Sequence, residues 1–261
     1  MRTILRRRLL LILLELWLPA VLVAAWWIWS ASADAPFFPP LSDILDRFRQ
    51  MWLFSLFVSD VLPSLRNLAI GFAIASLVGI ALGILIGRMR WLRSLTEPLI
   101  HFMRSTPGVA IVPIFVLVLG FGASMKISII AVSALFPTLI ATIDGVRSVD
   151  PVLLDSARVY HLNRRQRVLQ LLLPGAGPQI FAGLQVSLQT AFVVMIASEM
   201  LGSTQGIGAL TLKAQQSFEV VDMWSGIVLL GVLGYLINVL FLIVRRRWLG
   251  WYDGLRKVAN S

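Results

Sequence analysis

The stretch that decides the fold is LAIGFAIASLVGIALGILIG, residues 68–87. It carries no charged side chain, and its length matches the ~20 residues that a helix needs to cross the hydrocarbon core of a bilayer. Small residues recur within it at a uniform spacing of four, a spacing that places them on one face of a helix. They are Gly71, Ala75, Gly79, Gly83 and Gly87. This stripe predicts a face where another helix backbone packs closely.

Similar apolar runs recur along the whole chain and predict a polytopic membrane protein. Of its 261 residues, 58% are hydrophobic and 14% are charged, and the mean hydropathy is +0.84. One soluble core could not bury so much apolar surface. Together with residues 68–87, five runs give six expected spans: residues 9–29, 110–121, 127–143, 180–200 and 227–244. The third and fifth spans are expected to begin further upstream. Because backbone groups in hydrocarbon need internal partners, we expect α-helices.

The basic residues favour one side of these spans. With the N-terminus in the cytoplasm, 17 of the 23 Lys and Arg residues fall on the cytoplasmic side. Five remain outside and Arg104 falls within the third span; the five are Arg47, Arg49, Arg66, Lys126 and Lys213. This asymmetry predicts that both termini are cytoplasmic. It also accounts for the net charge of +10 without a nucleic-acid partner. The basic residues at the start of the sequence and the long apolar run that follows them are interpreted as a first span that is not cleaved off as a signal peptide.

Several kinds of chemistry are disfavoured by the residue content. The chain has no cysteine, so disulfides and thiolate metal ligands are excluded. Its two histidines have no acidic neighbours, so no metal site is expected. Neither a G-x-x-x-x-G-K-[ST] nor an H-E-x-x-H motif occurs. We therefore expect neither a catalytic site nor an ATPase site in this polypeptide.

Two amphipathic segments lie outside the spans. Residues 41–57 are expected to form a helix at the outer interface, with Ser42 as its N-cap. Its apolar face would carry Ile44, Leu45, Phe48 and Trp52.

The longest cytoplasmic stretch, residues 148–174, is expected to form two short helices. Asp150 is a good N-cap and Pro151 suits a first turn, so the first helix should start there. Asn163 would cap a second helix that ends before Pro174.

The same stretch resembles a known family. In the inner-membrane permeases of binding-protein-dependent ABC importers, the signature is Glu-Ala-Ala, three residues, Gly, nine residues, Ile-x-Leu-Pro. Every spacing is met here, by Asp155, Ser156, Ala157, His161, Leu171, Leu173 and Pro174. His161 replaces the family Gly, which is favoured at a helix end with positive φ, and His tolerates that region better than a branched residue.

Other motifs are similar to those of the permease branch for sulfonates, taurine and nitrate, although related branches carry other small compounds. They cover most of residues 36–251. Among them are Ser64-Leu65-x-Asn67, Arg104-x-x-Pro107, Phe121-Gly122 before Lys126, Ala197-Ser198-Glu199 and Gly206-Ile207-Gly208.

The resemblance implies a type I importer fold of six transmembrane helices in a bacterial inner membrane. The chain would be one permease domain over residues 1–261: the first span and outer helix in residues 1–60, a core in residues 61–251, and coupling helices in residues 148–174. It further implies a second permease copy, an ATPase dimer that binds ATP and Mg, an external binding protein and a small organic anion as cargo. Residues of the signature, together with Arg158, would couple the permease to the ATPase.

Polar residues inside the spans are candidates for the translocation path. Arg104 could attract an anion, or it could snorkel to the interface or pair with a carboxylate. Glu199 could line the path, cap a turn or pair with a basic residue, and the structural roles are favoured. The full candidate set is Arg104, Thr106, Pro107, Gln185, Gln189 and Glu199. A secondary transporter or an integral-membrane enzyme remains the alternative, although neither inverted repeats nor clustered catalytic groups are evident.

Overall fold

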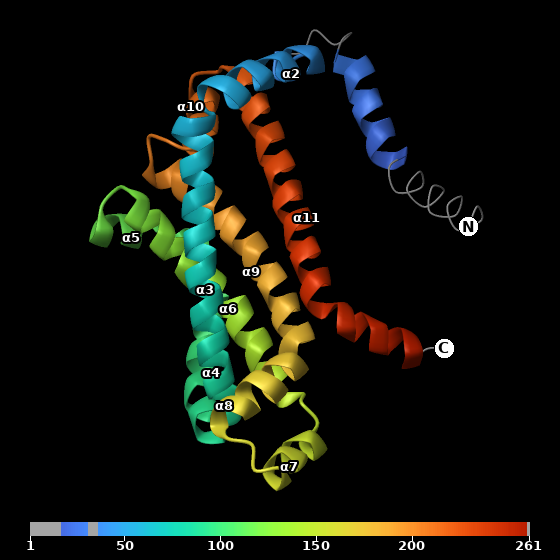
Figure 1. Cartoon of the computed structure of the whole chain (residues 1–261). Coiled ribbons are helices and arrows are strands. Elements are labelled where there is room, and N and C mark those ends of the chain that lie inside the picture. Colours follow the sequence, from blue (N-terminus) through green and yellow to red (C-terminus); the bar gives the residue numbers. More distant parts are fainter. Residues whose placement is uncertain (1–16, 31–35, 260–261) are drawn as a thin grey trace, which may run out of the picture.

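The computed structural model describes residues 17–30 and 36–259, with side chains described through residue 252. Every regular element within these residues is helical (Figure 1). A helix over Trp17–Ser30 precedes α2 (Leu41–Gln50), which continues through two π-helical turns, η1 (Met51–Ser55) and η2 (Phe57–Val61), into α3 (Leu62–Arg88). The remaining elements are α4 (Arg90–Ser105), η3 (Gly108–Ile111), α5 (Val112–Leu119), α6 (Ala123–Arg147), α7 (Pro151–Val159), α8 (Arg164–Gln166), η4 (Arg167–Leu172), α9 (Leu173–Gly202), α10 (Ile207–Gln216) and α11 (Val220–Ala259).

Four continuous helical stretches are long and apolar enough to cross a membrane. They are Phe57–Arg88, Ala123–Arg147, Arg164–Gly202 and Val220–Tyr252. A fifth candidate is the pair Arg90–Ser105 and Gly108–Leu119. The predicted first span, residues 9–29, lies partly outside the described residues. The described part of it belongs to the helix Trp17–Ser30. The all-helical membrane fold is therefore confirmed, whereas the count of six spans and the cytoplasmic position of the termini stay predictions.

The third predicted span is not one straight helix. Its two halves, α4 and α5 with η3, meet at an angle of 87°. The bend lies at Thr106 and Pro107, which both adopt extended backbone angles. A proline ring clashes with a preceding residue in the helical region, so Thr106 is held extended and α4 ends there. By contrast, Pro98 and Pro137 lie inside helices.

The small-residue stripe of α3 lies against α6. A Cβ atom added to Gly71 would approach Ile130 to 2.6 Å, and one added to Gly83 would approach Thr142 to 2.5 Å. Gly79 and Gly87 face α6 in the same way, and Ala75 is buried. Since side chains larger than these would collide, the stripe sets the close approach of the two helices. Figure 1 shows α3 and α6 side by side, with α9 next to α6.

The predicted stop at Pro174 is wrong. Helical structure runs without interruption from Arg164 to Gly202, and Pro174 lies in the first turn of α9. The turn before it, η4, has the wider π-helical hydrogen-bond pattern. Proline cannot donate a backbone hydrogen bond, and a π-helical turn is one way to accommodate such a break without ending the helix.

One end of the bundle is closed by α2, α10 and the start of α11 (Figure 1). Trp52 is buried and donates from its ring nitrogen to Ser225 at 3.0 Å. Arg47 makes two hydrogen bonds to Asp222, at 2.5 and 2.7 Å. The expected N-cap at Ser42 is wrong: Pro40 occupies that position, and the Ser42 hydroxyl donates to Asp43 at 3.1 Å. On the apolar face of α2, Ile44 is buried against the protein, while Leu45 is exposed.

Candidate functional site

Helix α7 projects from the end of the bundle opposite α2 and α10 (Figure 1). Local capping fixes its limits. The Asp150 carboxylate accepts from the backbone N–H of Val152 at 2.8 Å, which satisfies a free donor at the helix start. After the helix ends, His161 adopts a φ of +51° and reverses the chain. Asn163 and Gln166 then form a reciprocal capping box that starts the next helix.

The outward face of α7 carries exposed side chains, and we name it the docking face. It consists of Val152, Asp155, Val159 and the adjoining Tyr160. The first three lie at helical spacings of three and four, on one face. Val159 is 74% exposed among the described residues. Apolar side chains grouped on a short projecting helix are typical of a surface that a partner protein buries.

The remaining residues of the motif divide into two groups. Ala157 is only 4% exposed and faces the body of the protein, and Leu171 and Leu173 are half-buried. Asp155 and Arg158 pair at 2.7 Å on the exposed side. Ser156, His161 and Pro174 are also exposed. The motif therefore combines residues that hold α7 in place with residues that are free to contact a partner.

The structure does not bring all of the path candidates together. Arg104, Thr106 and Pro107 line a cavity of about 250 Å³ at the bend between α4 and α5. Gln185 lies elsewhere: its side chain donates to Asn238 at 3.4 Å and accepts from Arg245 at 3.5 Å, both on α11. Gln189 is exposed. Gln185 therefore makes interhelical hydrogen bonds between α9 and α11.

Glu199 is the centre of a buried polar network at the opposite end from α7. Its side chain is 0% exposed. One carboxylate oxygen accepts from the Ser64 hydroxyl at 2.5 Å and lies 3.5 Å from the Lys126 ammonium. The other accepts from the backbone N–H of Gly208 at 3.0 Å. Glu199 of α9 thus connects α3, α6 and the start of α10. It accepts a hydrogen bond at the start of α10 and forms an ion pair with Lys126.

The network includes residues that the sequence did not mark as functional. Asp60 is buried and accepts from the backbone N–H of Gly206 at 2.8 Å. Lys126 was assigned to the outer side, yet it is only 7% exposed and donates to the Gln205 carbonyl at 3.1 Å. The position of this lysine, four residues beyond Gly122 and within an apolar span, was the sequence feature that could have indicated a buried charge. Its partner, Glu199, is 73 residues away and could not be identified from spacing.

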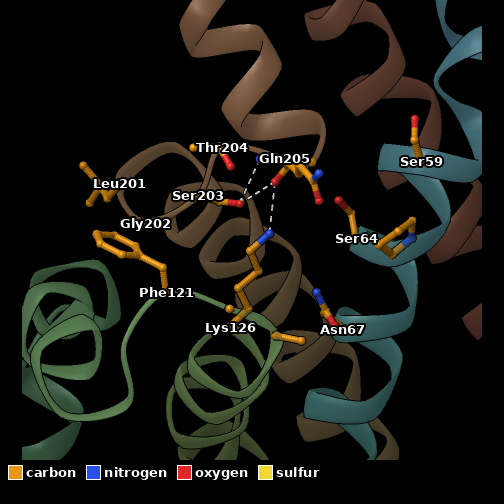
Figure 2. Close-up of a pocket in the computed structure, with 14 residues that line it drawn as sticks. Ser59, Ser64, Asn67, Phe121, Lys126, Leu201, Gly202, Ser203, Thr204 and Gln205 are labelled. Atoms are coloured by element: carbon orange, nitrogen blue, oxygen red, sulfur yellow. Dashed lines mark hydrogen bonds between the residues drawn. The ribbon is translucent and has the colours of Figure 1, made fainter.

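A cavity of about 500 Å³ adjoins this network (Figure 2). It opens between the start of α3, the start of α6 and the loop that joins α9 to α10. Many of its lining groups are polar: Ser59, Ser64, Asn67, Lys126, Ser203, Thr204 and Gln205. Among the residues that the structure describes, no group of three or more His, Asp or Glu side chains could hold a metal ion.

Comparison with known proteins gives consistent matches. Residues 75–249 match the family model described as "Binding-protein-dependent transport system inner membrane component". A putative aliphatic sulfonates transport permease protein of Bacillus subtilis is 30% identical, over 91% of this chain and 88% of its own. A taurine transport system permease protein of Escherichia coli is 26% identical, over 89% and 87%. A bicarbonate transport system permease protein of Synechococcus elongatus is 31% identical, over 86% and 84%.

A solved structure has the same fold. The chain superimposes on the inward-facing MetNI methionine ABC transporter with a TM-score of 0.66, over 76% of this chain and 97% of that one. The two sequences are 20% identical. At this identity the likeness concerns the arrangement of helices only.

Proposed function

The chain belongs to the family of binding-protein-dependent transport system inner membrane components, and on that premise we propose that it forms half of an ATP-driven import channel for a small organic anion. It is a multi-pass protein of the inner membrane. The anionic cargo is inferred from the relatives, which are named for sulfonates, taurine and bicarbonate. Six spans with both termini in the cytoplasm complete the proposal.

The observation that carries the proposal is the docking face of α7. Val152, Val159 and Tyr160 are exposed at the tip of a projecting helix, beside the ion pair of Asp155 and Arg158. A separate ATPase that buries this face would move α7 as its nucleotide sites open and close. Because Ala157 is packed against the body of the chain, such a movement would pass to α9 and its neighbours as a rigid-body displacement.

The partners follow from the same reasoning. The chain itself has no P-loop motif, so ATP and Mg would be bound by the ATPase subunits. A second copy of the permease would complete the path, and an external binding protein would deliver the cargo. Arg104, which lines the cavity at the bend between α4 and α5, is the proposed anion-attracting group within the path.

The proposal is tested by uptake into proteoliposomes that hold the permease with its ATPase and contain ATP. Addition of the cargo-loaded binding protein is expected to start uptake, and an ATPase variant lacking the P-loop lysine should abolish it. Uptake that persists with this variant, or that responds to an ion gradient in place of ATP, would favour a secondary transporter and overturn the proposal.

A further inference from the structure

The cavity beside Glu199 contains a polar side chain that no protein group satisfies. Asn67 is only 6% exposed, and it lines the cavity. No hydrogen bond joins its carboxamide to another described residue, and the carboxamide is not among the fully enclosed unpaired groups, so it opens on the cavity. An amide that faces a cavity without a protein partner is free to bond to a ligand or to an ordered water. In Figure 2, Asn67 and Lys126 approach the same space from two different helices.

The positive end of α6 opens on the same cavity. Gly122 and Ala123, at the start of this 25-residue helix, are lining residues. No side chain caps the helix, and its first turn contains no acidic residue. The free N–H groups and the helix dipole at such an end attract negative charge. Lys126, one turn further along α6, adds an ammonium group to the same wall.

Two carboxylates lie nearby, but both are already engaged by the start of α10. Asp60 accepts from the backbone N–H of Gly206 at 2.8 Å and from the Ser59 hydroxyl at 2.6 Å. Glu199 accepts from the backbone N–H of Gly208 at 3.0 Å and from Ser64 at 2.5 Å. These bonds account for both oxygens of each carboxylate. The donors left for a ligand are therefore the Asn67 amide, the first N–H groups of α6 and one N–H of the Lys126 ammonium. The other N–H groups of Lys126 face the Gln205 carbonyl at 3.1 Å and the Glu199 carboxylate at 3.5 Å.

We propose that this cavity is a binding site for an oxyanion group, a sulfonate or a carboxylate, at the mouth of the permease remote from α7. The Asn67 amide and the start of α6 donate hydrogen bonds to the oxyanion, and Lys126, whose charge is paired with Glu199 at 3.5 Å, offers its remaining N–H. That this group belongs to the transported cargo rests on the proposed function, whereas the anion site itself does not. The site lies at the end opposite α7 and is distinct from the Arg104 cavity.

The absence of cysteine from the chain allows a direct test. Thr204 is exposed and lines the cavity, so Thr204→Cys places one thiol at its rim. In membranes containing the full chain, its rates of reaction with an anionic sulfonatoethyl methanethiosulfonate and a cationic trimethylammonioethyl methanethiosulfonate are compared. Each rate is divided by the rate at which the same reagent reacts with a free thiol in solution. We expect the anionic reagent to be favoured about ten-fold. Preference for the cationic reagent would overturn the proposal.

Variants of Asn67 make the test specific. Asn67→Asp keeps the shape of the side chain but adds negative charge, and it is expected to remove the anionic preference. The matched control Gln216→Glu adds the same charge on exposed α10, away from the lining, and should leave the preference unchanged. Asn67→Leu, which removes the donor without adding charge, should weaken the preference partially. Equal effects of Asn67→Asp and Gln216→Glu would contradict the assignment.

Competition by simple anions identifies the ligand chemistry. Methanesulfonate or acetate is expected to slow labelling of Thr204→Cys, and the more effective anion reveals whether a sulfonate or a carboxylate fits better. No protection by either would overturn the site. Because labelling requires neither ATP nor a binding protein, an anion site could be found even if ATP-driven uptake failed, so the two proposals can fail separately.

Discussion

Replacement of Val159 by Glu is expected to abolish ATP-driven uptake while the permease still inserts and folds. In the chain alone Val159 is 74% exposed, so the substitution should change the free energy of unfolding by no more than about 0.5 kcal/mol. Once an ATPase covers the docking face, the new carboxylate would be desolvated without a partner. Such a group costs about 2–5 kcal/mol, or roughly 30- to 4,000-fold in affinity. Uptake into proteoliposomes and co-purification of the ATPase measure the effect.

The matched control is Val159→Leu, which keeps an apolar side chain at the same position and should retain uptake. Ala157→Glu would not be a clean test of the docking face. Ala157 is 4% exposed, so its replacement would disturb the packing of α7 itself. Normal uptake and normal ATPase binding by Val159→Glu would show that the docking face does not contact the ATPase.

Replacement of Glu199 by Ala is expected to destabilise the permease strongly. It would leave the Lys126 ammonium, which is 7% exposed, without its carboxylate. The Ser64 hydroxyl would lose one of its bonds and the Gly208 N–H its acceptor. Removal of one partner from a buried ion pair costs about 3–5 kcal/mol. A lower midpoint of thermal unfolding in detergent, together with a reduced yield of folded protein, would report this loss.

A second substitution separates the unpaired charge from the other losses. Lys126→Met in the Glu199→Ala background removes the unpaired ammonium and should recover part of the lost stability. Glu199→Gln, which keeps one acceptor oxygen, should be less harmful than Glu199→Ala. The assignment of Glu199 as a structural tie would be wrong if Glu199→Ala unfolded at the wild-type temperature.

Several features that depend on neighbours in sequence were predictable, although the N-cap expected at Ser42 was not found. Asp150 and Asn163 cap their helices as expected, because a capping side chain contacts backbone groups two or three residues away. The positive φ of His161 follows from a helix end where the family has Gly. The spacing of Gly71 to Gly87 indicated a close helix contact, although nothing in the spacing identified α6 as the partner.

Features that depend on distant contacts were not predictable. The break at Thr106 and the continuation of the helix from η4 into α9 past Pro174 both involve proline. Proline ends a helix in the first setting and is accommodated by a π-helical turn in the second. Tertiary packing decides between these outcomes. The Glu199 network joins residues as far apart as Ser64 and Gly208, so its members were visible only as separate polar residues.

The central claim is that α7 is the contact point for a separate ATPase, and a cross-link tests it most directly. The chain has no cysteine, so Val159→Cys carries one thiol for a photoactivatable cross-linker. Leu236→Cys, on the exposed surface of α11, is the control. We expect the thiol at position 159 to form a cross-link to a P-loop ATPase, and the thiol at position 236 to form none. A thiol at position 159 that never cross-links to the ATPase, or that is labelled only from outside the cell, would contradict the account.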